Sequence, residues 1–95
     1  MEPTQKTITG AGGLALAADH WPAPDGHPIV LMHGGGQTRH AWGATGRALA
    51  AKGYEVLALD LRGHGDSGWA EDGDYGFDAY RDDVRAVQAL SLIHI

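Results

Sequence analysis

Apolar residues along the chain gather in short runs that end at glycine-rich or proline-rich turns. The run Pro28–Met32 is apolar throughout, which is typical of a strand buried on both faces of a parallel sheet. The run Tyr54–Leu59 has the same character. Between the two, Thr38 can cap a helix that continues to about Lys52, and Gly53 follows where a left-handed helix end is favoured. The pattern predicts a strand–helix–strand unit with parallel strands.

Helical spacing predicts which side chains of two helices face the core. The first helix would direct inward Ala41, Thr45, Ala48 and Leu49, with Trp42 near its start. A second helix is predicted over Phe77–Leu90, with an apolar stripe formed by Phe77, Tyr80, Val84, Val87 and Leu90. Its charged residues, among them Arg81, Asp82 and Arg85, would then face water.

The first part of the chain predicts a different kind of pairing. Lys6–Thr9 and Leu14–Ala18 flank the glycine turn Gly10–Gly13, which favours an antiparallel hairpin. Pro22–Gly26 then reads as a surface turn. The chain is therefore predicted to be α/β in class, with a hairpin, a parallel strand–helix–strand unit and a following helix in one partial domain over residues 1–95.

Composition narrows the classes of function. The chain has 95 residues, a formal charge of −5 and no cysteine, which excludes disulfides and thiolate metal sites. Its few basic residues are scattered, so a nucleic-acid partner is not expected. No apolar run is long enough for a membrane span, and a cytoplasmic location is the default expectation. The 15 glycines cluster where apolar runs end, as turns and close backbone approaches require.

Two glycine-rich loops carry the candidate chemistry. The loop His33–Thr38 joins a predicted buried strand to a helix, and ligands of parallel sheets bind beside such loops. Its glycines would let backbone N–H groups face a substrate oxygen and stabilise a developing oxyanion. The alternative is a tight turn without chemistry. The second loop, Asp60–Gly68, follows the next strand.

Together these loops carry a family resemblance. His33-Gly34 after an apolar strand, Trp42 further along, and Asp60–Ser67 (DLRGHGDS) after the next strand resemble the α/β-hydrolase family. The likeness is strongest to its epoxide-hydrolase-like, haloperoxidase-like and C–C-hydrolase-like branches. It covers about residues 5–90, and the order of the two motifs with a helix between them makes it specific.

The resemblance implies roles for particular residues. Gly35 matches the position whose backbone N–H supplies half of the oxyanion hole. His33 matches a residue that braces the loop and does not act as a base. The other residues that match the supporting loops are Gly34, Gly36, Asp60, Arg62, Gly63, Gly65 and Ser67. The family's sheet order would also place the strand at 54–59 between the strand that begins at Leu14 and the strand that begins at Pro28.

The catalytic residues of the family do not match any position in the chain. Its nucleophile motif, G-x-S-x-G or an aspartate version, is absent, and the acid and histidine of the triad come later still. We therefore expect an N-terminal portion of a hydrolase for a small organic substrate, inactive alone, with its triad beyond residue 95. The ending Ser91–Ile95 is unlike the family's next strand and resembles translated adapter sequence, so it is expected not to be native.

Other interpretations start from isolated motifs. Gly63–Gly68 fits G-x-G-x-x-G, the fingerprint of a nucleotide-binding oxidoreductase, but an acidic loop follows it where a helix should begin. Gly65–Gly68 also resembles the nucleophile segment of chymotrypsin-like proteases, with Ser67 as the nucleophile. Those proteases are all-β proteins that contain cysteine, whereas this chain is predicted to be α/β and has none, so a loop-stabilising role is expected for the Ser67 hydroxyl. His33, His40 and His64 lack metal-ligand spacing, so neither a metal nor a cofactor is expected. A non-catalytic remnant that acts as a binding module, or self-associates through an open strand edge, is the main alternative.

Overall fold

The computed structural model describes residues 2–33, 37–70 and 72–93. Its strands form one four-stranded sheet in the order β1-β2-β4-β3. The strands are β1 (Thr4–Thr9), β2 (Ala15–Trp21), β3 (Pro28–Met32) and β4 (Glu55–Leu59). β1 and β2 pair antiparallel, β2 and β4 pair antiparallel, and β3 and β4 pair parallel. The α/β class, the hairpin, the parallel unit and the position of β4 in the sheet are confirmed.

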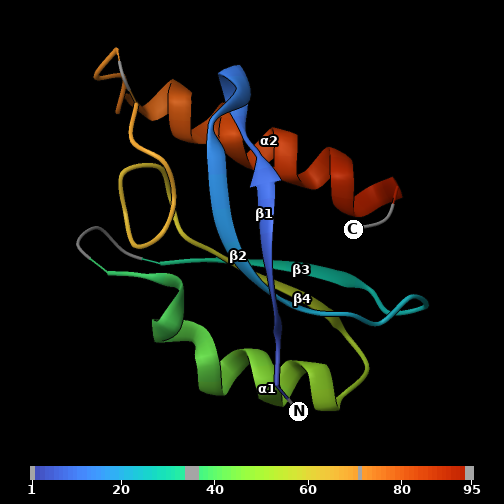
Figure 1. Cartoon of the computed structure of the whole chain (residues 1–95). Coiled ribbons are helices and arrows are strands. Elements are labelled where there is room, and N and C mark those ends of the chain that lie inside the picture. The colour runs from blue at the N-terminus through green and yellow to red at the C-terminus, as the bar shows by residue number, and fades with distance from the viewer. Residues whose placement is uncertain (1, 34–36, 71, 94–95) are drawn as a thin grey trace.

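Two helices cover opposite faces of this sheet, so the fold has three layers (Figure 1). A short 3-10 turn, η2 (Arg39–Trp42), leads into α1 (Gly43–Ala51). The longer α2 (Phe77–Ile93) lies on the other face, near the hairpin turn η1 (Ala11–Gly13). Alternate residues of β2 and β4 contribute side chains to two separate hydrophobic cores, one on each face of the sheet, because successive strand side chains point to opposite faces.

The inner face predicted for α1 is only partly right: Leu49 and Trp42 pack against the core, but the other predicted positions do not. Thr38 precedes η2 without a side-chain capping bond, and Ala41, Thr45 and Ala48 are exposed. The buried positions are Gly46 and Ala50, with Leu49 partly covered as expected. The fully buried Trp21 causes this difference, because its large ring fills the space under α1 and leaves room for small residues only.

The stripe predicted for α2 is only partly right. Val87 is fully buried, but the Phe77 side chain is 87% exposed, and the side chain of Leu90 lies outside the described residues. Ala79 and Asp83 are buried instead. The inward face of the helix differs from the predicted apolar stripe because it includes Asp83. The Asp83 carboxylate can be buried because it pairs with a buried arginine of the loop after β4.

Gly46 gives a test of this packing. A Cβ at position 46 would lie 2.5 Å from the Trp21 ring, whereas a Cβ at position 43 of the same helix would meet only the end of the Arg47 side chain at 3.5 Å. We expect Gly46→Ala to lower the free energy of unfolding by about 1–3 kcal/mol through overpacking. Gly43→Ala is the matched control and should leave stability unchanged or raise it by up to about 1 kcal/mol. Urea unfolding of both variants decides, and equal effects would show that the Trp21 contact is unimportant.

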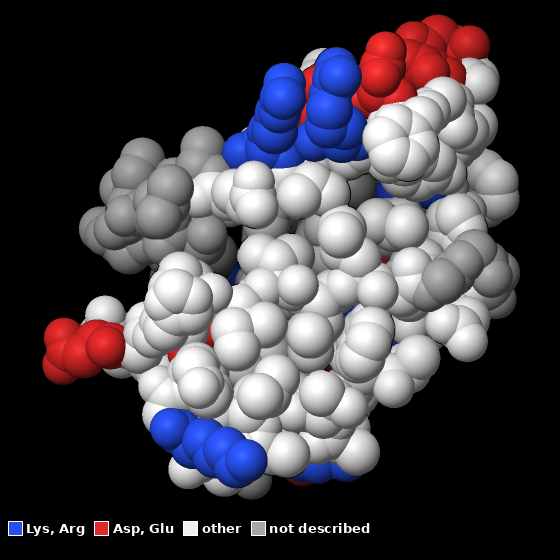
Figure 2. All heavy atoms as spheres, turned by 180° about the vertical axis from the view of Figure 1, so that it is seen from behind, with Lys and Arg blue, Asp and Glu red and all other residues white. Residues whose placement is uncertain are grey.

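β3 lies at one edge of the described sheet and is only half-buried. Beside its carboxyl end, an apolar hollow of about 530 Å³ opens between Met32, Leu61 and the α2 residue Val84. Seen from behind the view of Figure 1, the surface between the two helices carries almost no charged side chain (Figure 2). No helix among the described residues is long and apolar enough to cross a membrane.

An open, uncharged strand edge favours pairing with another strand. We therefore expect the 95-residue chain to self-associate, which sedimentation over a range of concentrations would detect. Met32 is 43% exposed, so Met32→Lys should weaken the association by adding a charge at the edge. Thr45→Lys, on the exposed face of α1, is the control. A monomer at every concentration would contradict the expectation.

Candidate functional site

The two predicted loops meet at the carboxyl ends of the parallel strands. Met32 and Leu59 are partners in the β3–β4 register, so His33 and Asp60 leave the sheet side by side. The backbone N–H of Leu61 donates to Nε2 of His33 at 3.0 Å, and His33 is buried. Nε2 of His33 is therefore the hydrogen-bond acceptor in this contact. The histidine thus ties the end of β3 to the loop after β4.

The ring of His64 lies beside that of His33 at a tilt. The two ring centroids are 5.0 Å apart and the rings are tilted by 52°. Nδ1 of His64 lies 3.0 Å from the carbonyl oxygen of Arg62, so this ring closes a local turn. Within the described part of the chain, no group of three His, Asp or Glu side chains could hold a metal ion.

Asp60 organises the second loop from a fully buried position. Its carboxylate accepts the backbone N–H of Arg39 at 2.6 Å and that of Asp66 at 3.1 Å, and it pairs with the Arg39 guanidinium. A side chain at Gly65 would run into this carboxylate, and Gly65 also has a positive φ of 51°, which favours glycine. Burial alone would raise the pKa of Asp60, but these donors hold that pKa below its ordinary value.

Arg39 is the residue that the sequence interpretation missed. Its side chain is buried, and its Nε donates to Asp19 at 3.0 Å while Nη1 donates to Asp60 and, at 3.0 Å, to Asp66. Burial opposes the charged guanidinium, but the three carboxylates outweigh it and raise the pKa of Arg39 above its ordinary value. The available signal was a lone arginine soon after the glycine loop, which is too weak to single out a buried ion pair.

The Ser67 hydroxyl joins two backbone segments. It donates to the carbonyl oxygen of Asp60 at 2.6 Å and accepts the backbone N–H of Ala17 at 2.8 Å. The side chain is buried, so the loop after β4 is joined to the neighbouring strand β2. A hydroxyl proton held by a backbone carbonyl is not available to a catalytic base, which argues against Ser67 as a nucleophile.

We expect Ser67→Ala to lower the free energy of unfolding by about 1–3 kcal/mol, because it leaves the buried N–H of Ala17 without its partner. Ser67→Thr retains the hydroxyl but adds a methyl group to a buried site. Thermal unfolding of Ser67→Ala beside Thr7→Ala, which removes a hydroxyl at an exposed position of β1, would measure the effect. A stability equal to that of the unchanged chain would show that water replaces the hydroxyl.

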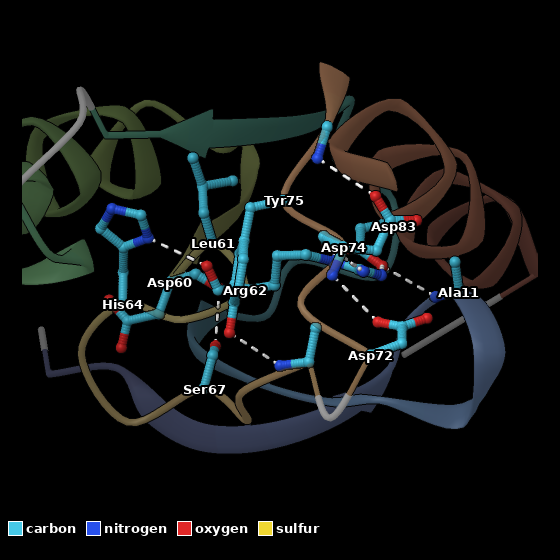
Figure 3. A network of polar contacts seen from close by, with 12 residues as sticks. Ala11, Asp60, Leu61, Arg62, His64, Ser67, Asp72, Asp74, Tyr75 and Asp83 are labelled. Carbon is cyan, nitrogen blue, oxygen red and sulfur yellow. Dashed lines mark hydrogen bonds and ion pairs between the residues drawn. The ribbon is translucent and has the colours of Figure 1, made fainter. Parts of the chain in front are cut away.

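Arg62 and Asp83 join the loop to α2 (Figure 3). Nε and Nη2 of Arg62 donate to the two carboxylate oxygens of Asp83 at 2.7 and 2.8 Å. Asp83 also accepts the backbone N–H of Ala11 at 2.8 Å, and Nη1 of Arg62 reaches the carbonyl oxygen of Asp74 at 2.9 Å. The hydrogen bonds to Asp83 raise the pKa of Arg62, against the opposing effect of burial. One ion pair therefore connects the hairpin turn, the loop and the helix.

The structure describes the glycines of the second loop but not the three glycines of the first. Gly34, Gly35 and Gly36 lie outside the described residues, so the oxyanion-hole assignment of Gly35 stays a prediction. Gly63 has a positive φ of 73°, and a side chain there would meet the ring of Tyr75. The stretch from Gly63 to Gly68 consists of turns, and α2 begins only at Phe77, so these glycines do not open a phosphate-binding helix.

Comparison with known proteins agrees with this geometry. The family model described as alpha/beta hydrolase fold matches residues 27–94. A non-heme chloroperoxidase of Burkholderia pyrrocinia is 40% identical over 92 residues, which cover 93% of this chain and 33% of that protein. An esterase of Mycobacterium tuberculosis is 45% identical over 47 residues, which cover 50% of this chain and 15% of that protein.

Solved structures give the same picture. The crystal structure of an epoxide hydrolase from Vigna radiata superposes with a TM-score of 0.83 at 26% identity, over 96% of this chain and 29% of that chain. The chain thus spans about a third or less of the length of these relatives. The family model covers most of the chain and the fold agrees with it, so the chain belongs to the α/β-hydrolase fold family.

Proposed function

We propose that this chain is the N-terminal portion of an enzyme that hydrolyses a small organic substrate, such as an ester or an epoxide. The observation that carries the proposal is the pair of loops at the carboxyl ends of β3 and β4. The two loops are joined by a hydrogen bond from the backbone N–H of Leu61 to Nε2 of His33. This edge of a parallel sheet is where α/β proteins bind their ligands. The relatives described as an esterase and an epoxide hydrolase support hydrolysis as the reaction.

In this proposal the chain supplies the oxyanion-stabilising side of the site. The backbone N–H of Gly35 would donate to the oxygen that gains charge in the transition state. His33 would brace the loop, since its Nε2 is occupied by a backbone N–H and cannot take a proton from a nucleophile without losing that bond. The residues from Asp60 to Ser67 would hold the loop from below through buried polar contacts.

The nucleophile, the acid and the catalytic histidine would lie beyond residue 95. The motifs G-x-S-x-G and G-x-D-x-G do not occur in the sequence. A serine nucleophile gives esterase-like chemistry through an acyl-enzyme, whereas an aspartate gives epoxide-hydrolase-like chemistry through an alkyl-enzyme ester. No cofactor is needed for either reaction.

The first test is to sequence the source DNA through the codon of Leu90 and onward. We expect the reading frame to continue into a strand followed by G-x-S-x-G or G-x-D-x-G. The encoded protein is then purified and assayed with p-nitrophenyl acetate and with styrene oxide. Turnover of the ester predicts a serine at the centre of the motif, and turnover of the epoxide predicts an aspartate.

Two results would overturn the proposal. One is a stop codon in the source DNA that leaves a natural chain without a nucleophile motif, which would favour a non-catalytic remnant. The other is a complete protein that carries the motif, folds cooperatively and turns over neither substrate class. Replacing the central residue of the motif with alanine is the control for contaminating hydrolases.

A further inference from the structure

The segment between β3 and η2 is held at its two described ends by neighbouring residues. At the first end, Nε2 of His33 accepts the backbone N–H of Leu61 at 3.0 Å. At the second end, the backbone N–H of Arg39 donates to Asp60 at 2.6 Å, and its guanidinium pairs with the other oxygen of the same carboxylate. Asp60 and Leu61 are consecutive, so one short stretch after β4 fixes both ends.

A guanidinium suits this place because three carboxylates approach it from three parts of the chain. Asp19 belongs to β2, Asp60 follows β4, and Asp66 lies in the loop beyond. Nε donates to Asp19 while Nη1 donates to Asp60 and Asp66, which requires donors fixed at different directions on one planar group. A lysine ammonium is a single point charge and cannot reproduce this arrangement.

We propose that Arg39 is a positioning residue for the oxyanion-stabilising loop. The inference rests on the proposed function, since it assigns to Arg39 the task of holding the described ends of that loop in register over Asp60 and Leu61. Preorganised donors stabilise a transition state only when the backbone that carries them does not have to move during the reaction. Arg39 itself does not touch the substrate.

The first experiment uses hydrogen exchange in the 95-residue chain and needs no activity. We expect Arg39→Lys to speed exchange of the amides at positions 39 and 61 by about tenfold, while the amides of the β1–β2 hairpin keep their protection. Arg47→Lys, at an exposed position of α1, is the matched control. Uniformly faster exchange, or no change at either amide, would overturn the proposal. If Arg39→Lys fails to fold, Asp19→Asn removes the charged acceptor of Nε while leaving the pairing of Arg39 with Asp60, and faster exchange at the same two amides is expected.

The second experiment uses the complete protein encoded by the source DNA. We expect Arg39→Lys to lower kcat by about 100-fold with little change in KM, because a displaced loop affects the transition state more than substrate binding. An active parent whose kcat is unchanged by Arg39→Lys overturns the role of Arg39 and leaves the proposed function in place. An inactive parent that shows the local exchange change overturns the proposed function, although the contact of Arg39 with the loop ends would stand.

Discussion

Replacing Asp83 with alanine is expected to lower the free energy of unfolding by about 3–5 kcal/mol, because it leaves the buried Arg62 guanidinium without its partner. The same change removes the acceptor for the backbone N–H of Ala11. Native domains have total stabilities of about 5–15 kcal/mol, so a loss of this size would remove most of the stability of a domain at the lower end of that range. Urea unfolding followed by circular dichroism would measure it.

Asp82 is the matched control for this prediction. It is the adjacent acidic residue on the same helix, but its side chain is 46% exposed and its ion pair is with Arg81, whose side chain is 45% exposed. Asp82→Ala should change stability by less than about 1 kcal/mol, as expected for a surface ion pair. Equal losses in the two variants would show that the fold does not depend on the buried pair. The double variant Arg62→Met, Asp83→Leu should be less destabilised than Asp83→Ala alone, because it leaves no buried charge.

Asp60→Asn is expected to lower the free energy of unfolding by about 3 kcal/mol near neutral pH, because a buried carboxylate that accepts two backbone N–H groups and a guanidinium becomes neutral. Asparagine keeps the shape of the side chain but replaces one acceptor oxygen with an NH2 donor, so the change reports the lost charge and one lost acceptor rather than a cavity. Asp25→Asn, which neutralises an exposed carboxylate in the turn after β2, is a suitable control.

The Asp60 contribution should depend on pH in a defined direction. The pKa of Asp60 in the folded chain lies below its ordinary value of 3.8. Its stabilising effect is therefore complete well above pH 3.8 and is lost as the pH falls through the lowered pKa. The stability difference between the unchanged chain and Asp60→Asn should shrink as the pH is lowered through this range. A difference that is constant from neutral to acid pH would show that folding does not change the pKa of Asp60.

Local patterns predict the strands and the loops of this chain well. The run Pro28–Met32 is a strand at the predicted residues, and Gly53 ends the first helix with a φ of 93°. These features depend on residues close in sequence: apolar runs, turn-forming glycines and the side-chain period of a strand. The position of β4 between β2 and β3 followed from family resemblance, because strand order is not a local property.

The helix faces and the polar contacts could not be predicted from local pattern. The small residue Gly46 faces inward because Trp21, 25 positions earlier in the sequence, occupies the space beneath it. Asp83 is buried because Arg62 neutralises it, although a hydrophobic-moment argument places every aspartate in water. Arg39 is found only when β2, β4 and the loop after β4 are brought together. Each of these cases depends on a partner that the fold supplies.

The hydrogen bond from Ala11 to Asp83 has a consequence for the order in which the chain folds during synthesis. Its two residues are 72 positions apart, so the hairpin turn leaves the ribosome long before its acceptor does. The pairing of β1 with β2 can form early, because its contacts are local. β2 must wait for β4, and the turn at Ala11 must wait for α2, which emerges last among the described elements. Nascent chains that stop short of Asp83 should therefore hold a formed hairpin with an unanchored turn, and the whole sheet should become resistant to protease only when α2 is complete.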